Sequence, residues 1–293
     1  MRSWDDGRSS MHATVSDVNP RTTRRNVATF TAVAWSVGWI AAALQSRIVD
    51  PSAQQLGLLL WLVTPLATVL LLRGFAGDGW KDFGLAPAFR TNALGWSAAV
   101  LVHPLCAGLV VAIGVLLGWT AVAGSAPDLL WVFAYGLAPS FVKNVFEELA
   151  WRGCLTPKVR SLGANDLVGH AVVGLIWAGW HVPYFLYLVD PAALHAATNL
   201  TLTAFVAMAI PSLVAVSIVY GELRLLTNSV WPAVVAHAIG NALIDVLIVN
   251  GFVQVASGRE LLASPGYQGV LSIVVFLVAG VALHRVRIRR ELG

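Results

Sequence analysis

The sequence predicts an all-α protein: a polytopic membrane helix bundle of about eight transmembrane helices with both termini in the cytosol. Of its 293 residues, 57% are hydrophobic and only 12% are charged, which is too apolar for a soluble domain of this size. The apolar residues gather in eight runs that can each form a crossing helix, which needs roughly 20 residues. The basic residues lie in alternate loops, as they do in membrane proteins. The lipid bilayer is therefore an expected partner.

The order of the elements follows from these runs. Residues 1–26 are polar and rich in arginine, without the short apolar core and cleavage site of a signal peptide, and are expected to form a flexible cytosolic tail. Residues 77–85, between the second and third spans, mix polar and aromatic side chains as interfacial segments do. Residues 27–284 are expected to form one transmembrane domain without an internal repeat, followed by a basic cytosolic tail at 285–293 that would lie against anionic lipid. The expected spans are residues 27–44, 56–72, 94–119, 129–149, 167–189, 200–220, 230–249 and 270–283.

The basic residues predict the orientation of the bundle. With the N-terminus in the cytosol, sixteen of the nineteen lysines and arginines fall in cytosolic segments, one of them a short loop with Glu222 and Arg224. The outside loops hold only Arg47 and Arg259, while Lys143 lies within a span. This alternation accounts for the net charge of +4, so no nucleic-acid partner is expected. The two cysteines show neither metal-site nor disulfide spacing.

A cluster of charges near the end of the fourth span is the first indication of a functional site. Ionisable residues at membrane depth cost roughly 2.5–3.5 kcal/mol each on insertion scales and are usually functional. Glu147 and Glu148 are neighbours and point about 100° apart on a helix, and Arg152 lies one turn after Glu148. One glutamate can therefore be held by Arg152 while the other faces a cavity. Lys143 lies one turn before Glu147, but snorkelling to the interface is favoured over pairing with it.

Two later spans carry further polar pairs at helical spacing. Trp177 and His181 are four residues apart on the fifth span, and His237 and Asn241 are four apart on the seventh. Asp245 continues the second face, where orienting His237 and a helix-end role are both open. A glutamate beside two histidines is suited to activating water, since imidazoles can bind a metal or polarise a carbonyl group. An asparagine can donate to a developing oxyanion.

Together these residues resemble the CPBP family of intramembrane proteases, which includes the CAAX prenyl endopeptidases and the bacterial Abi or bacteriocin-processing proteins. Each motif alone would occur by chance, but three in order on separate spans are specific. The resemblance covers about residues 129–249, the expected motif core. The matching motifs are Glu147-Glu148-x-x-x-Arg152, Trp177-x-x-x-His181 and His237-x-x-x-Asn241.

The resemblance implies roles for these residues. Glu147 would be the water-activating base, with His181 working beside it. Glu148 and Arg152 would form a structural or orienting pair.

The resemblance also implies that His237 and Asn241 hold the oxyanion or complete the polar site. His181 and His237 are candidate ligands of a zinc ion, because the family is labelled a metalloprotease. Two histidines are fewer than the three protein ligands usual for catalytic zinc unless a glutamate is the third, so a metal-independent reaction is the other expectation. Trp177 departs from the phenylalanine more often found in the family.

The expected function is therefore intramembrane hydrolysis of a peptide bond in a membrane-associated or lipidated peptide or protein, in a bacterial plasma membrane and with the site opening to the cytosol. A membrane transporter, or a non-catalytic immunity or scaffold protein on the same fold, is the alternative. The transporter predicts two similar halves, which are not apparent. The scaffold predicts the loss of a catalytic or supporting residue, and all six of these are present: Glu147, Glu148, Arg152, His181, His237 and Asn241.

The motif residues can form a single site only if they lie at similar depths in the membrane. A fourth span ending at residue 149 would leave Glu147 at the cytosolic edge, while helical rise places the two motif histidines roughly 11 and 21 Å inside. The fourth span is therefore predicted to extend to about residue 157. Of the other histidines, His103 is expected to pack or hydrogen-bond within its span, and His170 and His195 to lie in loops or at the interface.

Overall fold

The all-α membrane bundle is confirmed. A computed structural model describes residues 19–48, 55–87, 89 and 92–292, so most of the expected N-terminal tail lies outside the described residues. Within them, eight helices are long and apolar enough to cross a membrane. The spans are α1 (Pro20–Gln45), α2 (Leu56–Phe75), α3 (Ala93–Leu116), Ala126–Ser161, Asp166–Leu188, α8 (Leu202–Thr227), Trp231–Val249 and α11 (Val270–Leu292).

Three of these spans are composite. The fourth consists of α4 (Ala126–Ala150), a π-helical turn η2 (Trp151–Leu155) and α5 (Thr156–Ser161). The fifth joins α6 (Asp166–Pro183) to η3 (Tyr184–Leu188), and the seventh joins α9 (Trp231–Ile244) to η4 (Asp245–Val249). The remaining elements are β1 (Thr120–Val122), antiparallel to β2 (Val253–Val255), and the short helices α7 (Pro191–Ala197) and α10 (Glu260–Ala263).

Local signals in the sequence explain where the central helices begin. The Ser125 hydroxyl accepts from the Asp128 backbone N–H ahead of α4, and the Asn165 side chain accepts from Leu167 N–H ahead of α6. These side chains satisfy backbone donors that a helix start leaves unpaired. At the other end of α8, Asn228 adopts the left-handed conformation that commonly stops a helix.

Several helix ends differ from those expected. The fourth span runs on past Glu147 to Ser161, as the depth argument predicted. By contrast, α8 continues to Thr227, so the expected cytosolic loop around Glu222 and Arg224 is wrong: both residues are helical and buried. The helix α1 begins inside the expected tail, and α11 carries the basic residues of 285–290 on its last turns.

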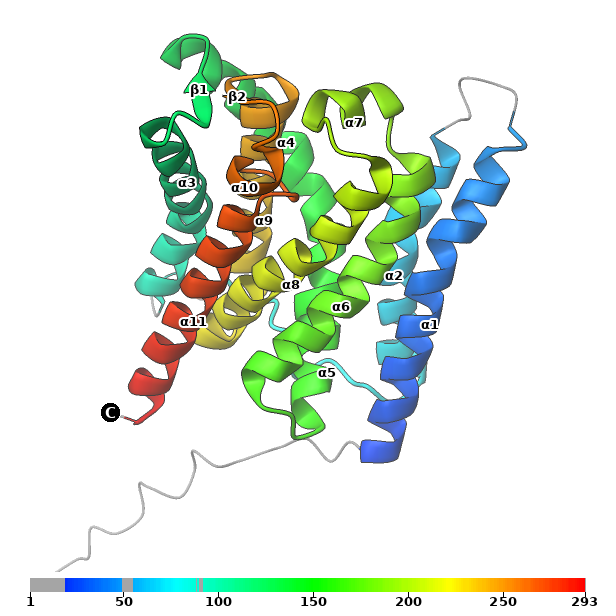
Figure 1. Ribbon diagram of the computed structural model, residues 1–293. Helices are drawn as coiled ribbons and strands as arrows, with labels where there is room; N and C mark the ends of the chain where they lie inside the picture. Colours follow the sequence, from blue (N-terminus) through cyan, green and yellow to red (C-terminus); the bar gives the residue numbers. More distant parts are fainter. Residues whose placement is uncertain (1–18, 49–54, 88, 90–91, 293) are drawn as a thin grey trace, which may run out of the picture.

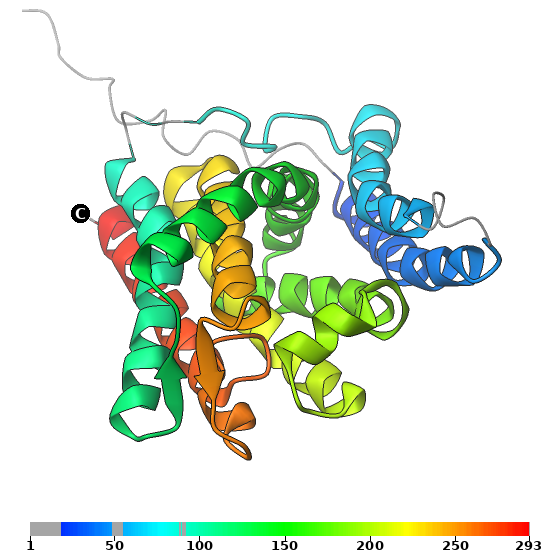
Figure 2. The ribbon, with the colours of Figure 1, turned by 90° about the horizontal axis from the view of Figure 1, so that it is seen from above.

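The helices surround a central group formed by α4, α6, α8 and α9. Helix α9 packs against α4 and α3, and α8 packs against α6 and α11. Seen from above, α1 and α2 stand together at one edge, and α3 and α11 at the other (Figure 2). The start of α1 and the end of α11 lie at the same end of the bundle, while β1, β2 and α7 lie at the opposite end (Figure 1). This placement agrees with an even number of crossings.

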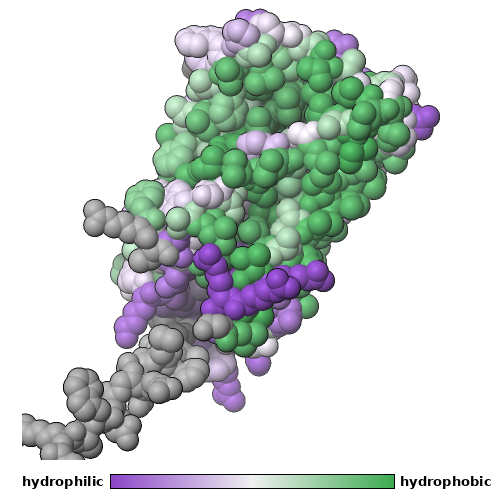
Figure 3. Space-filling model, turned by 90° about the vertical axis from the view of Figure 1, so that its left-hand side faces the viewer, coloured by the Kyte–Doolittle hydropathy of each residue, from purple (hydrophilic) through white to green (hydrophobic). Residues whose placement is uncertain are grey.

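The outer surface is that of a membrane protein. On the face in Figure 3, apolar residues cover most of the height, and hydrophilic residues gather toward the end where α11 finishes. The exposed large apolar side chains include Leu101, Leu105 and Leu109 on α3 and Val274 and Val278 on α11. Such exposure would favour aggregation in water but suits contact with lipid.

Three buried cations fasten the segment between α2 and α3 to the bundle. Arg73 Nη1 lies 2.7 Å from Asp82 Oδ1, and Lys158 Nζ lies 3.2 Å from Asp82 Oδ2. Arg224 donates to the carbonyl oxygens of Asp82 and Arg152, at 2.7 and 3.1 Å. The expected interfacial segment is therefore fixed across the end of the bundle, directly beneath the charged cluster of α4.

Candidate active site

The three motifs meet in the interior of the bundle. Their ionisable side chains come from α4, α6 and α9 and are almost entirely buried, with Glu147 only 1% exposed. In lipid, a helix turns its polar side chains toward the bundle, where they find partners. The contacts below cross between all three helices, so the prediction of a single polar site is consistent with the structure.

Glu148 is the centre of a fully buried network. Its Oε1 atom lies 3.2 Å from Arg152 Nη1 and accepts a hydrogen bond from His237 Nδ1 at 2.8 Å. The Arg152 guanidinium lies over two rings, 4.8 Å from the centre of Trp177 and 5.1 Å from that of Tyr220. Its Oε2 atom is buried without a hydrogen-bond partner within the described residues, and Glu148 lines neither of the two cavities described below. Because Oε1 holds both Arg152 and His237, the geometry of Glu148 is that of a positioning residue.

One oxygen of Glu147 accepts a hydrogen bond, and the other has an ion-pair contact but no hydrogen bond within the described residues. Its Oε2 atom accepts a hydrogen bond from the indole Nε1–H of Trp177 at 3.0 Å. Its Oε1 atom is buried and has no hydrogen-bond partner within the described residues. The nearest cation is Lys143, whose Nζ lies 3.6 Å from Oε1 while its side chain is 39% exposed. Lys143 thus forms an ion pair with Glu147, and its side chain also remains partly exposed.

Trp177 holds both members of the expected catalytic pair. Its indole binds Glu147, and its backbone carbonyl lies 3.0 Å from His181 Nδ1. A carbonyl can only accept, so Nδ1 carries the proton and neutral His181 keeps Nε2 as an acceptor. The Trp177 ring also meets the rings of His181 and His237 edge to face, each at 5.3 Å. A phenylalanine here would keep the ring contacts but not the hydrogen bond to Glu147.

Asn241 is oriented by two residues to which the sequence gave no role. Its Nδ2 atom donates to Asn144 Oδ1 at 3.2 Å, and the Tyr267 hydroxyl donates to its Oδ1 atom at 3.4 Å. Asn144 lies one turn before Glu148 on the motif helix, which is a visible signal. Tyr267 comes from the loop between α10 and α11 and follows no motif. With the amide held in this sense, one Nδ2 hydrogen remains to donate to a ligand.

A large cavity opens onto this polar group. It has a volume of about 820 Å³ and a wall rich in aromatic side chains from several helices. His181, Asn241, Lys143, Asp245 and Tyr267 bring polar atoms to it. Asp245 therefore faces the cavity, while His237 is oriented by Glu148 instead.

Each motif helix changes to a π-helical turn close to its motif, and the turn on the fourth span contains Arg152. The turns η2, η3 and η4 follow Glu148, His181 and Asn241 within three to four residues. Such turns are rare in helices and are frequent at functional sites. Each one adds a residue to the helix and so changes which face the following side chains present.

The residues do not fit a catalytic zinc site. Among the described residues, no group of three histidine, cysteine, aspartate or glutamate side chains could hold a metal ion. His181 and His237 each keep one ring nitrogen, but the Trp177 ring contacts both of them, and catalytic zinc usually takes three protein ligands.

The histidines outside the motifs have structural partners. His103 Nε2 lies 2.7 Å from the Tyr220 hydroxyl, as expected of a hydrogen-bonded histidine within a span. His170 is buried on α6 with Nε2 3.2 Å from Glu222 Oε1, so its expected place in a loop or at the interface is wrong. His195 lies exposed on α7.

Comparison with known proteins identifies the segment that carries this site. Residues 128–243, from the start of α4 to the end of α9, match the sequence model of the family described as "Type II CAAX prenyl endopeptidase Rce1-like". The resemblance seen in the three motifs is thereby confirmed. No curated protein was found to match the chain.

Proposed function

Because residues 128–243 carry an Rce1-like domain of the type II CAAX prenyl endopeptidases, we propose that this multi-pass membrane protein is an intramembrane endopeptidase that uses a glutamate-activated water. One observation carries the mechanism. Glu147 is anchored through Oε2 by Trp177, and its buried Oε1 has no hydrogen-bond partner within the described residues. A buried, oriented carboxylate with one oxygen that accepts no hydrogen bond is suited to take a proton from water.

In the first step, water binds between Glu147 and His181. Oε1 of Glu147 accepts one proton of the water, and Nε2 of His181 accepts a hydrogen bond from the other O–H. The water oxygen then attacks the carbonyl carbon of the scissile bond. Trp177 makes a hydrogen bond to each of these side chains, which fixes their positions relative to each other and to the bound water.

In the second step, the carbonyl oxygen becomes an oxyanion that needs donors. The second Nδ2 hydrogen of Asn241 provides one, since the first is directed to Asn144. His237 donates from Nε2 when the Glu148–His237 pair holds a second proton. Donors fixed before the reaction stabilise such charge by several kcal/mol.

In the last step, the C–N bond breaks. The proton on Glu147 passes to the leaving nitrogen, which departs as an amine, and the hydroxyl from water remains in the new carboxyl group. Each bond cleaved consumes one water and leaves Glu147 ionised, so the cycle needs no other reactant. The reaction is proposed to be metal-independent, which the donor set around His181 and His237 favours.

The cavity supports a peptide or membrane-protein substrate that enters from the lipid. Its aromatic wall suits an apolar segment, with or without a lipid anchor, and its volume of about 820 Å³ holds several residues. CAAX-type processing and cleavage of a bacteriocin-type leader both fit this chemistry. We place the protein in a bacterial plasma membrane, with the basic end of the bundle in the cytosol. The large cavity is lined by Leu194 of α7 and by Asn250 and Gly266 at the opposite end of the bundle, so it extends away from the cytosol, contrary to the opening expected from the sequence.

The test is cleavage of a peptide library by the purified protein in lipid nanodiscs. Glu147→Gln keeps the Trp177 acceptor but removes the base, so kcat is expected to fall by at least about a thousandfold. Glu260→Gln, on α10, is the matched control and should cleave as wild type. A chelator should leave the wild-type rate unchanged, whereas inhibition reversed by zinc would reject the metal-independent reaction. Equal cleavage by Glu147→Gln would remove Glu147 as the base.

A further inference from the structure

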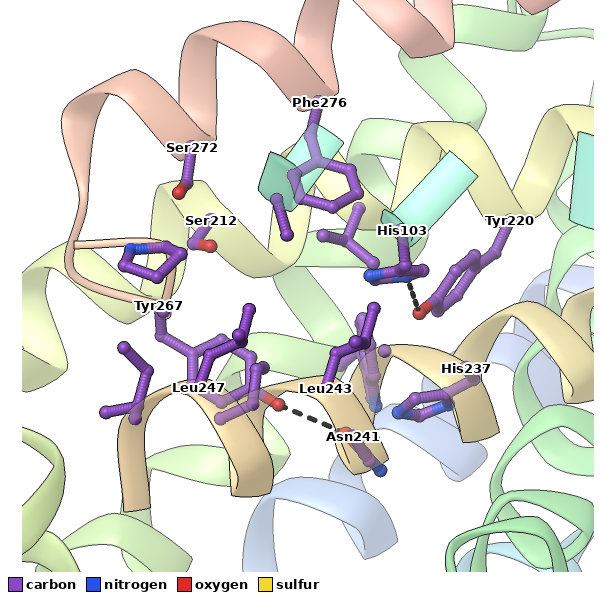
Figure 4. A pocket seen from close by; sticks show the side chains of 18 residues that line it. His103, Ser212, Tyr220, His237, Asn241, Leu243, Leu247, Tyr267, Ser272 and Phe276 are labelled. Carbon is purple, nitrogen blue, oxygen red and sulfur yellow. Dashed lines mark hydrogen bonds between the residues drawn. The ribbon is translucent and has the colours of Figure 1, made fainter. Parts of the chain in front are cut away.

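A second, smaller cavity lies behind the catalytic side chains. It has a volume of about 40 Å³ and is bounded by α3, α8, α9, α11 and the loop before α11. Figure 4 shows His103 and Tyr220 at one end of it and Ser212, Ser272 and Tyr267 at the other, with His237 and Asn241 along α9. None of these side chains except the last two belongs to the three motifs.

The wall of this cavity has unused hydrogen-bonding capacity. Ser212, which is only 4% exposed, brings a hydroxyl to the cavity wall. The Ser272 hydroxyl donates to the Ser264 carbonyl and can still accept. Tyr220 and His103 share one hydrogen bond, which leaves acceptor capacity on the Tyr220 hydroxyl. Polar groups buried in this way are normally paired with protein or with water.

The size of the cavity suits water. One buried water molecule occupies about 10–15 Å³ of cavity volume and needs two to four polar partners. The cavity of about 40 Å³ therefore has room for about three water molecules. Purely apolar cavities stay dry, but this one offers hydroxyl, imidazole and amide groups. Polar chemistry and volume therefore agree.

The small cavity and the large cavity share a wall at the active site. Asn241 and Tyr267 line both of them. The Tyr267 hydroxyl donates to Asn241, and burial raises the pKa of Tyr267, so the hydroxyl stays protonated and remains a donor. Tyr267 belongs to a loop rather than a helix, and Ile244, Ile248 and Gly266 also line both cavities.

We propose that the small cavity is a water-binding site, here called the water cavity, which supplies the hydrolytic water through the wall formed by Asn241 and Tyr267. This rests on the proposed function. Each peptide bond consumes one water, yet Glu147 is buried at membrane depth and an apolar substrate would displace water from the large cavity. Water in the small cavity, on the other side of Asn241 from the substrate, would remain bound while the substrate occupies the large cavity.

Its hydration can be measured without substrate. The purified full chain in nanodiscs is mixed rapidly with oxygen-18 water and exposed to a short X-ray pulse, and labelled side chains are identified by mass spectrometry. Phe276 and Tyr220, which are buried and line the cavity, should take up hydroxyl label. Phe30, which is 2% exposed and lines neither cavity, is the dry reference of the same residue type. Label on Phe276 no greater than on Phe30 would overturn the proposal.

Its role in hydrolysis is tested by two variants of equal shape. Ser212→Thr keeps a hydroxyl in the cavity, and Ser212→Val replaces it with a methyl group. For Ser212→Val, kcat should be at least about tenfold below that of Ser212→Thr, with KM within about twofold, because the substrate binds in the other cavity. If Ser212→Val does not fold, Ser212→Ala provides the same comparison at lower volume. Equal kcat values for hydroxyl and apolar variants would overturn the supply role.

Failure of the two proposals can be told apart. Labelled Phe276 in a wild-type protein that cleaves no peptide would reject the protease and, with it, the supply role. Cleavage by wild type with Phe276 unlabelled would reject the water cavity alone. Glu147→Gln should retain the label while losing cleavage, because Glu147 does not line this cavity.

Discussion

Trp177 orients two other residues of the site, one through its side chain and one through its backbone. Its indole N–H and its carbonyl oxygen fix Glu147 and His181, respectively. The sequence placed these residues on neighbouring helices but could not show this link, because a hydrogen bond across helices depends on their rotation. The same holds for Asn144 and Tyr267, which orient Asn241. The motif residues and the orienting pair Glu148 and Arg152 were predictable, whereas the contacts by which Trp177, Asn144 and Tyr267 orient them were not.

Trp177→Phe tests this link. The ring contacts with both histidines and Arg152 would remain, while Glu147 Oε2 would lose its donor. A lost hydrogen bond to a charged group costs about 1.5–3 kcal/mol, so kcat should fall by about 10- to 100-fold. KM should change little, since Trp177 does not line the large cavity. Steady-state kinetics on one cleaved peptide would decide, and an unchanged kcat would show that Glu147 needs no such anchor.

At the scale of elements, buried charge explains where hydropathy misplaced the helix ends. Glu222 and Arg224 resemble loop residues in sequence, yet both lie within α8 and are buried. Glu222 is paired with Arg287 at 2.7 Å and lies near His170 and His284, so its charge is compensated in the interior. A hydropathy profile treats each charged residue as unpaired. It could not place Glu222 in a helix, because the partners of Glu222 come from α6 and α11, far away in the sequence.

Arg287→Met should therefore weaken the attachment of α11 to the bundle and lower the stability of the protein. It removes the cation that binds Glu222 and Asp166 and leaves buried carboxylate behind. Breaking a buried pair in this way costs about 3–5 kcal/mol, which predicts a lower midpoint of thermal unfolding. Arg289→Met, on the exposed face of the same turns, is the control and should unfold as wild type. Equal midpoints for the two variants would mean that packing against α8, and not the ion pairs of Arg287, holds α11 in place.

The segment between α2 and α3 should be sensitive to acid. Burial alone would raise the pKa of Asp82, but the hydrogen bond from Arg73 and the charges of Arg73 and Lys158 bring it below its ordinary 3.8. A depressed pKa contributes stability above the unfolded pKa, and that contribution is lost as pH falls through the folded value. Because the carboxylate is partly exposed, the loss should be about 1 kcal/mol. The difference in unfolding free energy between wild type and Asp82→Asn should shrink from pH 7 to pH 3; a constant difference would contradict this.

At the scale of the whole molecule, eight crossings place both ends of the described chain on one side, as the loop charges predicted (Figure 1). That fold was predictable because apolar length and charge alternation are properties of the whole chain. The β1–β2 pair and the two cavities were not, since they arise from how loops and helices pack.

The predicted cytosolic side can be tested by cysteine labelling in intact cells. Ser257→Cys lies in the loop after β2, and Arg289→Cys lies near the end of α11, at opposite ends of the bundle. The two natural cysteines are buried and form the background. A membrane-impermeant maleimide should label position 257 in intact cells and position 289 only after lysis. The reverse pattern would invert the orientation.

The π-helical turns have a consequence for how this protein can change over time. Deleting one residue from Trp151–Leu155 would restore a regular helix and rotate everything after it by about 100° relative to Glu147. Lys158 would then turn away from Asp82 and Asp78 while the glutamates stayed in place. The π-helical turn thus sets the rotation about the helix axis between the glutamates of α4 and Lys158 of α5. We expect lineages of this fold to keep the length of this turn, together with Arg152, which lies within it and binds Glu148.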